Sequence, residues 1–196
     1  MSLALDPIAQ DLLFLGARTP RAFTDAPVSE KQVRAVYDLI KYAPTSLNQQ
    51  PMRVVLVRTP QARERLAGHM HDSNRDQVLG APLNAILLAD NEFHQKLPRV
   101  FPALPRAKDV YFAERSTRER SAVFNTALQM AYFILGIRAA GLAAGPIVGF
   151  DFRGVDKEFG NPDHSVQAVV TIGSPDESTF RPRAPRLDYD EVFTAV

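Results

Sequence analysis

Three short segments of apolar, β-prone residues constrain the fold of this chain more than any other feature. They are residues 53–57 (RVVLV), 84–90 (NAILLAD) and 166–173 (VQAVVTIG). Strands that are continuously apolar, without alternating polar positions, occur where a sheet is covered on both faces. We therefore expect an α/β or α+β sandwich with a central sheet between helices, although the pattern does not fix the strand order.

Helix start signals precede the first strand. Asp6 followed by Pro7 predicts an N-cap and a helix that runs to about residue 17. Ser29 begins a second helix, because Gln32 three residues later completes a capping-box pattern. An apolar stripe at i, i+3, i+4 and i+7 follows and predicts one buried face.

Further helices are expected after the first strand. Thr59 and Pro60 cap one of them. The longest is expected from about Arg115 to Ala140, with Gly141 as its C-terminal stop. The tail at 181–193 contains prolines and is expected to be extended.

Composition restricts the classes of function. The chain has 196 residues, enough for one domain (1–196) with a substantial core and short for two. Its net charge is +1, so no global field attracts nucleic acid or an anionic membrane. It has no cysteine, which excludes disulfides and thiol nucleophiles, and its four histidines do not form a metal-ligand set.

The sequence also indicates a cytoplasmic protein that does not enter a membrane. The N-terminal segment lacks a basic region and carries Asp6 and Asp11 early, which argues against a signal peptide. The most apolar region, residues 122–140, is interrupted by polar residues. It does not reach the roughly 18 unbroken apolar residues typical of a membrane span.

Polar side chains with binding potential collect in four stretches at element boundaries, namely 17–23, 43–51, 143–151 and 181–186. The first and last supply guanidinium groups, which suit a phosphate. The second is a run of neutral donors and acceptors, and the third has glycines that let a flat ligand approach the backbone. Each also has a plain interpretation, as a solvated basic turn, a polar turn, a tight helix-to-strand turn and a solvated tail.

Common catalytic signatures are missing from the sequence. It contains no GxGxxG, no GxxxxGK[ST] and no GxSxG motif. Two arginine clusters and two neutral polar loops, without an acid, base, nucleophile or metal candidate, favour chemistry carried by a bound organic cofactor.

Five short motifs occur in order between residues 18 and 185. They are R-T-x-R-x-F at 18–23, P-T-S-x-N-x-Q-P at 44–51, an asparagine at 74 seven residues before Ala-Pro, G-P-I-V-G-F-D at 145–151, and R-x-R-x-P at 181–185. Together they resemble the nitroreductase family of FMN flavoproteins. Two positions depart from the family pattern: Thr19 replaces the usual serine, and Val148 stands where many members have glutamate.

This resemblance implies an α+β nitroreductase-like fold with a central mixed sheet and an intertwined homodimer with an extended C-terminal arm. It implies one FMN per subunit, with NAD(P)H as electron donor in a ping-pong cycle and a small molecule as acceptor. No catalytic side chain is expected. The cofactor-binding residues that it implies are Arg18, Thr19, Arg21, Pro44, Thr45, Ser46, Asn48, Asn74, Gln77, Pro146, Ile147, Val148, Gly149, Arg181 and Arg183.

The resemblance also assigns expected roles. Arg18, Thr19, Arg21 and Arg183 hold the phosphate and the polar ring edge, and Asn74 meets the pyrimidine side of the flavin. The backbone N–H groups near Val148 and Gly149 face its reactive nitrogen. In the family, the segment at 44–48 serves the FMN of the other subunit.

Within the family, residues 90–102 (DNEFHQKLPRVFP) and 124–134 (FNTALQMAYFI) look like the malonic semialdehyde reductase branch of pyrimidine degradation. A substrate carboxylate would need a cation, for which Arg53, Arg115, Arg118 and Arg120 are candidates, although surface solvation is the simpler explanation of each. Alternatives are a reductase of quinones or nitroaromatics, a flavin-binding accessory protein without turnover, and a cofactor-free interaction protein with a basic arm.

Overall fold

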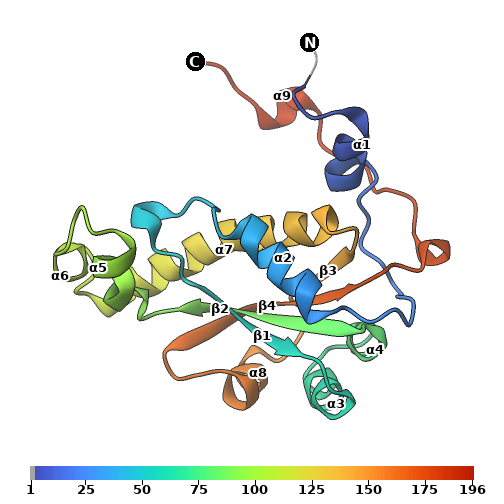
Figure 1. The fold of residues 1–196 in the computed structure, drawn as a ribbon, viewed down its shortest axis with the longest axis horizontal. Coiled ribbons are helices and arrows are strands. Elements are labelled where there is room, and N and C mark those ends of the chain that lie inside the picture. The colour runs from blue at the N-terminus through green and yellow to red at the C-terminus, as the bar shows by residue number, and fades with distance from the viewer. Residues whose placement is uncertain (1–2) are drawn as a thin grey trace.

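The computed structural model describes residues 3–196, and they form a sheet between two layers of helices (Figure 1). Helices α2 and α7 cover one face of the sheet, and α3, α4 and α8 cover the other. The predicted covered sheet is therefore confirmed. The four strands are β1 (Met52–Val57), β2 (Leu83–Asp90), β3 (Ala143–Ile147) and β4 (His164–Gly173).

The strand order is β1-β2-β4-β3, and each of the three pairings among the described residues is antiparallel. The expectation of a mixed sheet is therefore wrong for this chain. The expectation of a turn over 143–151 is also wrong in its first half, because residues 143–147 form the edge strand β3. Its alanines and glycine have low strand propensity, so pairing with β4 decides the conformation, and an edge position tolerates Pro146.

The α-helices are α1 (Pro7–Gln10), α2 (Glu30–Ile40), α3 (Pro60–Gly68), α4 (Asn74–Gly80), α5 (Leu97–Val100), α6 (Ala107–Val110), α7 (Arg115–Ala139), α8 (Phe152–Phe159) and α9 (Tyr189–Val192). A π-helical turn, η1 (Asp11–Leu15), follows α1 directly. The single helix predicted to residue 17 is therefore shorter and irregular. Short 3₁₀ turns are η2 (Ser46–Asn48), η3 (Phe93–Lys96) and η4 (Glu177–Thr179).

The helix start signals are confirmed. The Asp6 carboxylate accepts from the Ala9 N–H at 2.8 Å, and the Thr59 hydroxyl caps α3. Ser29 and Gln32 form a complete capping box. These caps satisfy N–H groups that a helix leaves without partners, which is why they mark helix starts in the sequence.

The two faces of β2 explain its continuous apolar run. Leu83, Ala85 and Leu87 pack towards α2 and α7, whereas Ile86 and Leu88 pack towards α3, α4 and α8. Every residue of β2 is buried. A strand with only one covered face would place alternate residues in water and would show polar residues there.

Helix α7 runs along the sheet and contacts α2 and all four strands. By length and composition alone it could cross a membrane, but the core helix of a soluble protein passes the same test. Gly141 follows it with a φ of 75°, so the predicted C-terminal stop is confirmed.

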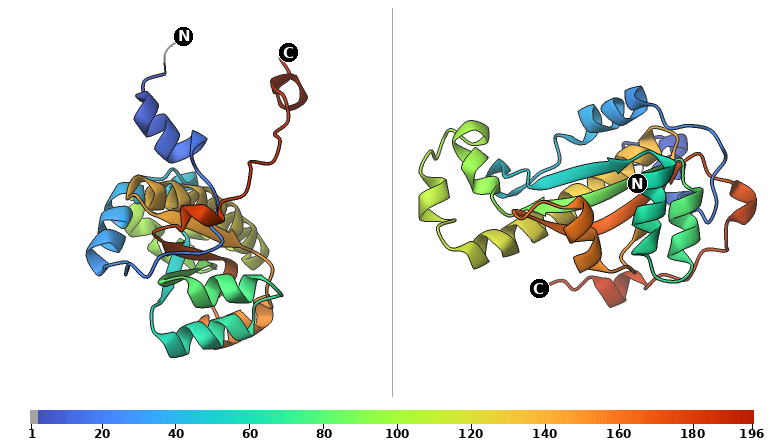
Figure 2. Two further views of the ribbon diagram at one scale, coloured as in Figure 1. Left: turned by 90° about the vertical axis from the view of Figure 1, so that its right-hand side faces the viewer. Right: turned by 90° about the horizontal axis from the view of Figure 1, so that it is seen from below.

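Both ends of the chain project from the layered body on the side of α2 and α7 (Figures 1 and 2). The C-terminal tail has no helix or strand from residue 180 to 188, and the short helix α9 follows. Residues 181–196 are exposed throughout.

Candidate functional site

A basic cavity of about 310 Å³ lies where the N-terminal segment, the end of α7 and the C-terminal tail meet. Its lining includes five arginines and no carboxylate: Arg18, Arg138, Arg181, Arg183 and Arg186. None of these arginines forms an ion pair with a carboxylate within residues 3–196. Because guanidinium groups remain charged and present paired donors, the cavity suits an anion with several oxygens, such as a phosphate.

Backbone carbonyls at the end of the π-helical turn and just after it orient two of these arginines. Arg18 donates to the Leu15 and Ala17 carbonyls at 3.2 and 3.0 Å. Arg183 donates to the same two carbonyls, with 3.1 Å to Ala17. Each arginine uses only one terminal nitrogen in these bonds, so other N–H groups of both side chains remain available to a ligand.

Thr19 connects the basic cavity to the β3 strand. A Cβ built on Gly145 would lie 3.7 Å from the Thr19 methyl carbon and 2.4 Å from the Thr171 hydroxyl oxygen. The Thr171 hydroxyl also donates to the Gly145 carbonyl at 3.2 Å. Gly145 is therefore required for the close approach of three segments that are distant in the sequence.

Asn74 contacts Gly149, at the other end of the segment that begins with Gly145. Its side-chain amide donates to the Gly149 carbonyl at 2.9 Å, and the His71 N–H donates to this carbonyl at 3.1 Å. A Cβ on Gly149 would lie 2.7 Å from the Asn74 amide nitrogen. Among residues 3–196, the Gly149 N–H donates to no protein acceptor, which leaves it available to a ligand.

The other predicted residues near this segment are less directly placed. Pro146 and Val148 are exposed, with Val148 at 66%, whereas Ile147 is buried in the core. The Gln77 amide donates only weakly to the Ser73 carbonyl, at 3.5 Å. Arg21 is exposed and does not line the basic cavity, so the structure does not bring it together with the other arginines.

The neutral stretch 43–51 lies elsewhere in the chain's own fold. The Ser46 N–H donates to the Asn125 side chain in α7 at 2.8 Å, and Asn48 donates to the Val100 carbonyl at 2.8 Å. Asn125 and Arg138 are thirteen residues apart in α7, which is about 20 Å along the helix. The predicted residues of this stretch, Pro44, Thr45, Ser46 and Asn48, are thus remote from the basic cavity of the same chain.

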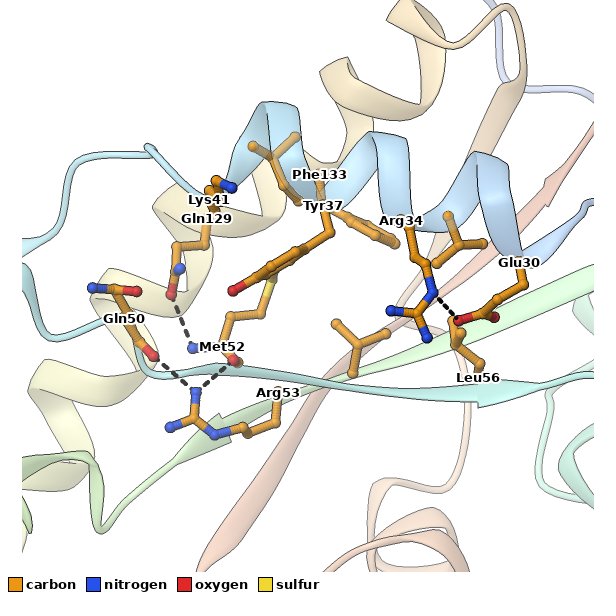
Figure 3. A pocket seen from close by; sticks show the side chains of 13 residues that line it. Glu30, Arg34, Tyr37, Lys41, Gln50, Met52, Arg53, Leu56, Gln129 and Phe133 are labelled. Atoms are coloured by element: carbon orange, nitrogen blue, oxygen red, sulfur yellow. Dashed lines mark hydrogen bonds and ion pairs between the residues drawn. The ribbon is translucent and has the colours of Figure 1, made fainter. Parts of the chain in front are cut away.

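A groove of about 470 Å³ runs between α2 and the free edge of β1 (Figure 3). Its apolar lining comes from both elements and from Phe133 of α7. Arg34 with Glu30 lies at one end, and Gln50 with Arg53 lies at the other (Figure 3). An uncovered edge strand beside apolar side chains is a template for pairing with another segment.

Three of the four candidate substrate cations pair with a carboxylate of the same chain. Arg115 pairs with Glu119 at 2.7 Å. Arg118 pairs with Glu92 at 3.1 Å and also donates to the Phe112 and Ala113 carbonyls.

Arg53 is the third paired cation, because it bonds the buried Asp90 carboxylate at 2.6 Å, as does Lys96. Burial alone would raise the pKa of Asp90, but the hydrogen bond from Lys96 and the charge of Arg53 outweigh it and hold this pKa below its ordinary value. Arg120 is exposed, and within residues 3–196 it pairs with no carboxylate.

Two arginines that line the basic cavity were not among the predicted cofactor-binding residues. Arg186 follows the last motif by one residue, and Arg138 lies in the last turn of α7. The only sequence signal for Arg138 is a charge near the end of an apolar helix. Its role depends on the N-terminal segment and the tail, which only the tertiary structure brings beside α7.

These features fit a flavin mononucleotide. An anionic end fits the arginine cavity, and a neutral polar end fits the Asn74 amide and the free Gly149 N–H. Thr19 and Gly145 lie between these two ends. The four residues from Gly145 to Gly149 span at most roughly 13 Å, which suits an elongated ligand lying along β3.

Comparison with known proteins agrees with this geometry. The family model described as "Nitroreductase family" matches residues 15–174. A Streptomyces coelicolor protein, provisionally named NADH dehydrogenase/NAD(P)H nitroreductase, is 59% identical over 196 residues and the full length of both chains.

Solved structures show the same fold. The crystal structure of a Bacillus subtilis protein provisionally named a nitroreductase has a TM-score of 0.86 at 21% identity, covering 94% of this chain and 97% of that one. An Exiguobacterium sibiricum protein with the same provisional name, in complex with FMN, also has a TM-score of 0.86, at 18% identity, covering 100% of this chain and 99% of that one. The family model matches most of this chain, and a relative is 59% identical over its full length, so this chain belongs to the nitroreductase family.

Proposed function

We propose that this protein is an FMN-dependent NAD(P)H oxidoreductase. The observation that carries this proposal is the order of these residues in space. Thr19 lines the arginine cavity and lies beside Gly145, and the segment from Gly145 leads to Gly149, which contacts Asn74. The provisional name of the Streptomyces relative and the FMN in the Exiguobacterium structure support it.

In this proposal the residues of the chain bind and orient the cofactor. Arg18, Thr19, Arg181 and Arg183 would hold the phosphate, and Asn74 with the Gly149 N–H would face the polar edge of the ring. When bound, FMN supplies the two-electron chemistry that passes hydride from NAD(P)H to an acceptor. Fixed cations and N–H donors stabilise negative charge that develops near them, because they need no reorganisation.

Flavin retention tests the cofactor assignment. We expect Arg18→Ala and Arg183→Ala each to weaken FMN binding by about 10- to 150-fold, since each removes charge-assisted hydrogen bonds. Arg153→Ala, which removes an exposed arginine from α8, should leave FMN binding unchanged. Titration of apoprotein by flavin fluorescence measures these affinities. Wild-type apoprotein that takes up no FMN would contradict the proposal.

We also propose a homodimer in which residues 44–48 face the cofactor of the partner. Two observations support it. The stretch is remote from its own basic cavity, and α7 exposes apolar residues at helical spacing, namely Val123, Phe124, Leu128 and Tyr132. A contiguous exposed apolar face of this kind is typical of an interaction surface.

The extended tail is the segment that we propose for the groove beside β1 of the partner. It exposes Leu187, Tyr189, Val192 and Phe193 beyond its arginines. The free edge of β1 offers unpaired backbone groups, and the groove offers apolar contacts. Removal of residues 187–196 should therefore weaken the dimer, which analytical ultracentrifugation measures.

For the acceptor we propose malonic semialdehyde, which gains a hydride and a proton to give 3-hydroxypropanoate. The support is the resemblance of segments 90–102 and 124–134, together with Arg120 as an unpaired cation for the carboxylate. We expect Arg120→Ala to raise KM for malonic semialdehyde but not for a quinone. Arg99→Ala, an exposed arginine on α5, is the matched control. Equal effects on both acceptors would contradict the assignment.

A further inference from the structure

Arg138 is a half-buried cation that forms no ion pair with a carboxylate of the described residues. It lies near the end of α7 and lines both the basic cavity and a neighbouring cavity of about 240 Å³. Among the described residues, its side chain forms one hydrogen bond, a long contact of 3.4 Å to the Leu13 carbonyl. Asp11 and Glu177 line the neighbouring cavity, but neither forms an ion pair within residues 3–196.

The surroundings of Arg138 disfavour an uncompensated charge. Burial lowers the pKa of Arg138, and the nearby charge of Arg183 lowers it further. An arginine nonetheless remains charged at neutral pH. A partly buried cation that faces a second cation costs free energy in the empty site, and a bound anion removes that cost.

Three segments direct their arginines to one place. Arg18, Arg138 and Arg183 come from the N-terminal segment, α7 and the tail. Arg18 and Arg183 donate to the carbonyls of residues 15 and 17, and Arg138 donates to that of residue 13. Arg138 is the one carried by a long helix that packs on the sheet. Its position is therefore fixed independently of the two irregular segments, which makes it a preorganised part of the cavity.

We propose that Arg138 is a further phosphate-binding residue, which contacts the phosphate group from the α7 side of the basic cavity. This inference rests on the proposed function for the identity of the ligand, a phosphorylated flavin, but the anion site stands on the geometry alone. Arg138 makes the cavity selective for FMN over riboflavin, since riboflavin lacks the phosphate.

The test compares FMN with riboflavin in apoprotein. Arg138→Met keeps a flexible apolar stem that can preserve packing while removing the charge. We expect the FMN affinity of R138M to fall roughly tenfold or more while the riboflavin affinity stays unchanged. R138K, which retains a charge but not the planar fork, should lose less FMN affinity than R138M, and Arg153→Met should lose none.

Inorganic phosphate supplies a second readout that does not involve a flavin. Phosphate should raise the melting temperature of wild-type apoprotein by more than that of R138M, because it binds the folded state. If R138M does not fold, R138K replaces it in the test. The inference then requires that R138K has a lower ratio of FMN affinity to riboflavin affinity than the wild type.

The outcomes separate this inference from the proposed function. If R138M and R138K lose FMN and riboflavin affinity by the same factor, or lose neither, the ratio of the two affinities is unchanged and the inference is overturned. Loss of both by the same factor would show a structural role for Arg138. Phosphate stabilisation that depends on Arg138, in a protein that binds neither flavin, would support the anion site and overturn the proposed cofactor.

Discussion

At the scale of single residues, the Asp90 carboxylate shows how a buried charge is maintained. It is 1% exposed at the end of β2, and Arg53 and Lys96 each bond it at 2.6 Å. The Glu92 N–H donates to its second oxygen at 2.9 Å. Such a carboxylate is tolerated because its oxygens have partners, and removing it would leave two cations unpaired.

We expect Asp90→Asn to lower the free energy of unfolding by about 3 kcal/mol, near the lower end for breaking a buried pair, because Arg53 and Lys96 are partly exposed. Asp38→Asn is the matched control. It removes the surface pair of Asp38 with Lys41 and should cost at most about 1 kcal/mol. Urea denaturation of the three proteins measures both values, and equal losses would contradict the role of Asp90.

The same carboxylate gives stability a dependence on pH. The folded-state pKa of Asp90 lies below its ordinary value, so the unfolded state binds the proton more tightly. The stabilisation is present above the unfolded-state pKa of about 3.9 and is lost as pH falls through the lower folded-state pKa. The difference in unfolding free energy between wild type and Asp90→Asn should therefore shrink below about pH 4. A constant difference from pH 7 to pH 3 would contradict this.

At the scale of elements, Gly136 sets the approach of α2 and α7. A Cβ on Gly136 would lie 2.3 Å from a methyl carbon of Ile40 and 3.3 Å from one of Val36. Ile40 and Val36 belong to the buried face of α2, and Gly136 belongs to the buried face of α7. Glycine lowers helix stability by itself, so its place here reflects close packing of the two helices.

Two opposing effects therefore decide the outcome of Gly136→Ala. Helix propensity favours alanine by about 1 kcal/mol, but overpacking costs about 1–3 kcal/mol. We expect net destabilisation, measured by urea denaturation, and a smaller effect of Gly136→Ala when it is made in an Ile40→Ala background, where the clash is absent. Gly68→Ala in α3 is the control, because nothing lies within 4 Å of its Cβ position, and it should be neutral or slightly stabilising. A stabilising Gly136→Ala would show that the helices can move apart.

At the scale of the whole molecule, the predicted cofactor-binding residues lie in two separate regions of the chain's own fold. The arginines gather near the end of α7, whereas residues 44–48 contact its first half through Asn125. The apolar face of α7 lies exposed between them. This arrangement links cofactor binding to subunit association in the proposed dimer, since a second copy would complete each site.

We therefore expect FMN affinity to depend on dimerisation. The double substitution Phe124→Asp and Leu128→Asp should produce monomers and weaken FMN binding by roughly tenfold or more, because the partner's hydrogen bonds are lost. Leu79→Asp, an exposed apolar position on α4, should do neither. Sedimentation and flavin titration on the same samples measure both effects. Monomers with unchanged FMN affinity would contradict the link.

Elements and motifs with local physical causes could be predicted from the amino-acid sequence. Asp6, Ser29 and Thr59 marked helix starts because their side chains cap nearby N–H groups. The apolar runs at 84–90 and 166–173 identified a covered sheet, because burial on both faces favours apolar residues at successive positions. The run at 53–57 forms the edge strand β1, which is only partly buried.

Features that depend on contacts between residues distant in sequence appear only in the tertiary structure. Strand β3 has weak strand propensity, and its pairing with β4 stabilises it. The strand order β1-β2-β4-β3 likewise depends on pairings between strands that are distant in sequence. Arg138 joins the basic cavity because the N-terminal segment and the tail meet at the end of α7, whereas Arg21 does not join it. Local propensity and capping act within a few residues, but convergence of charges depends on the packing of the whole chain.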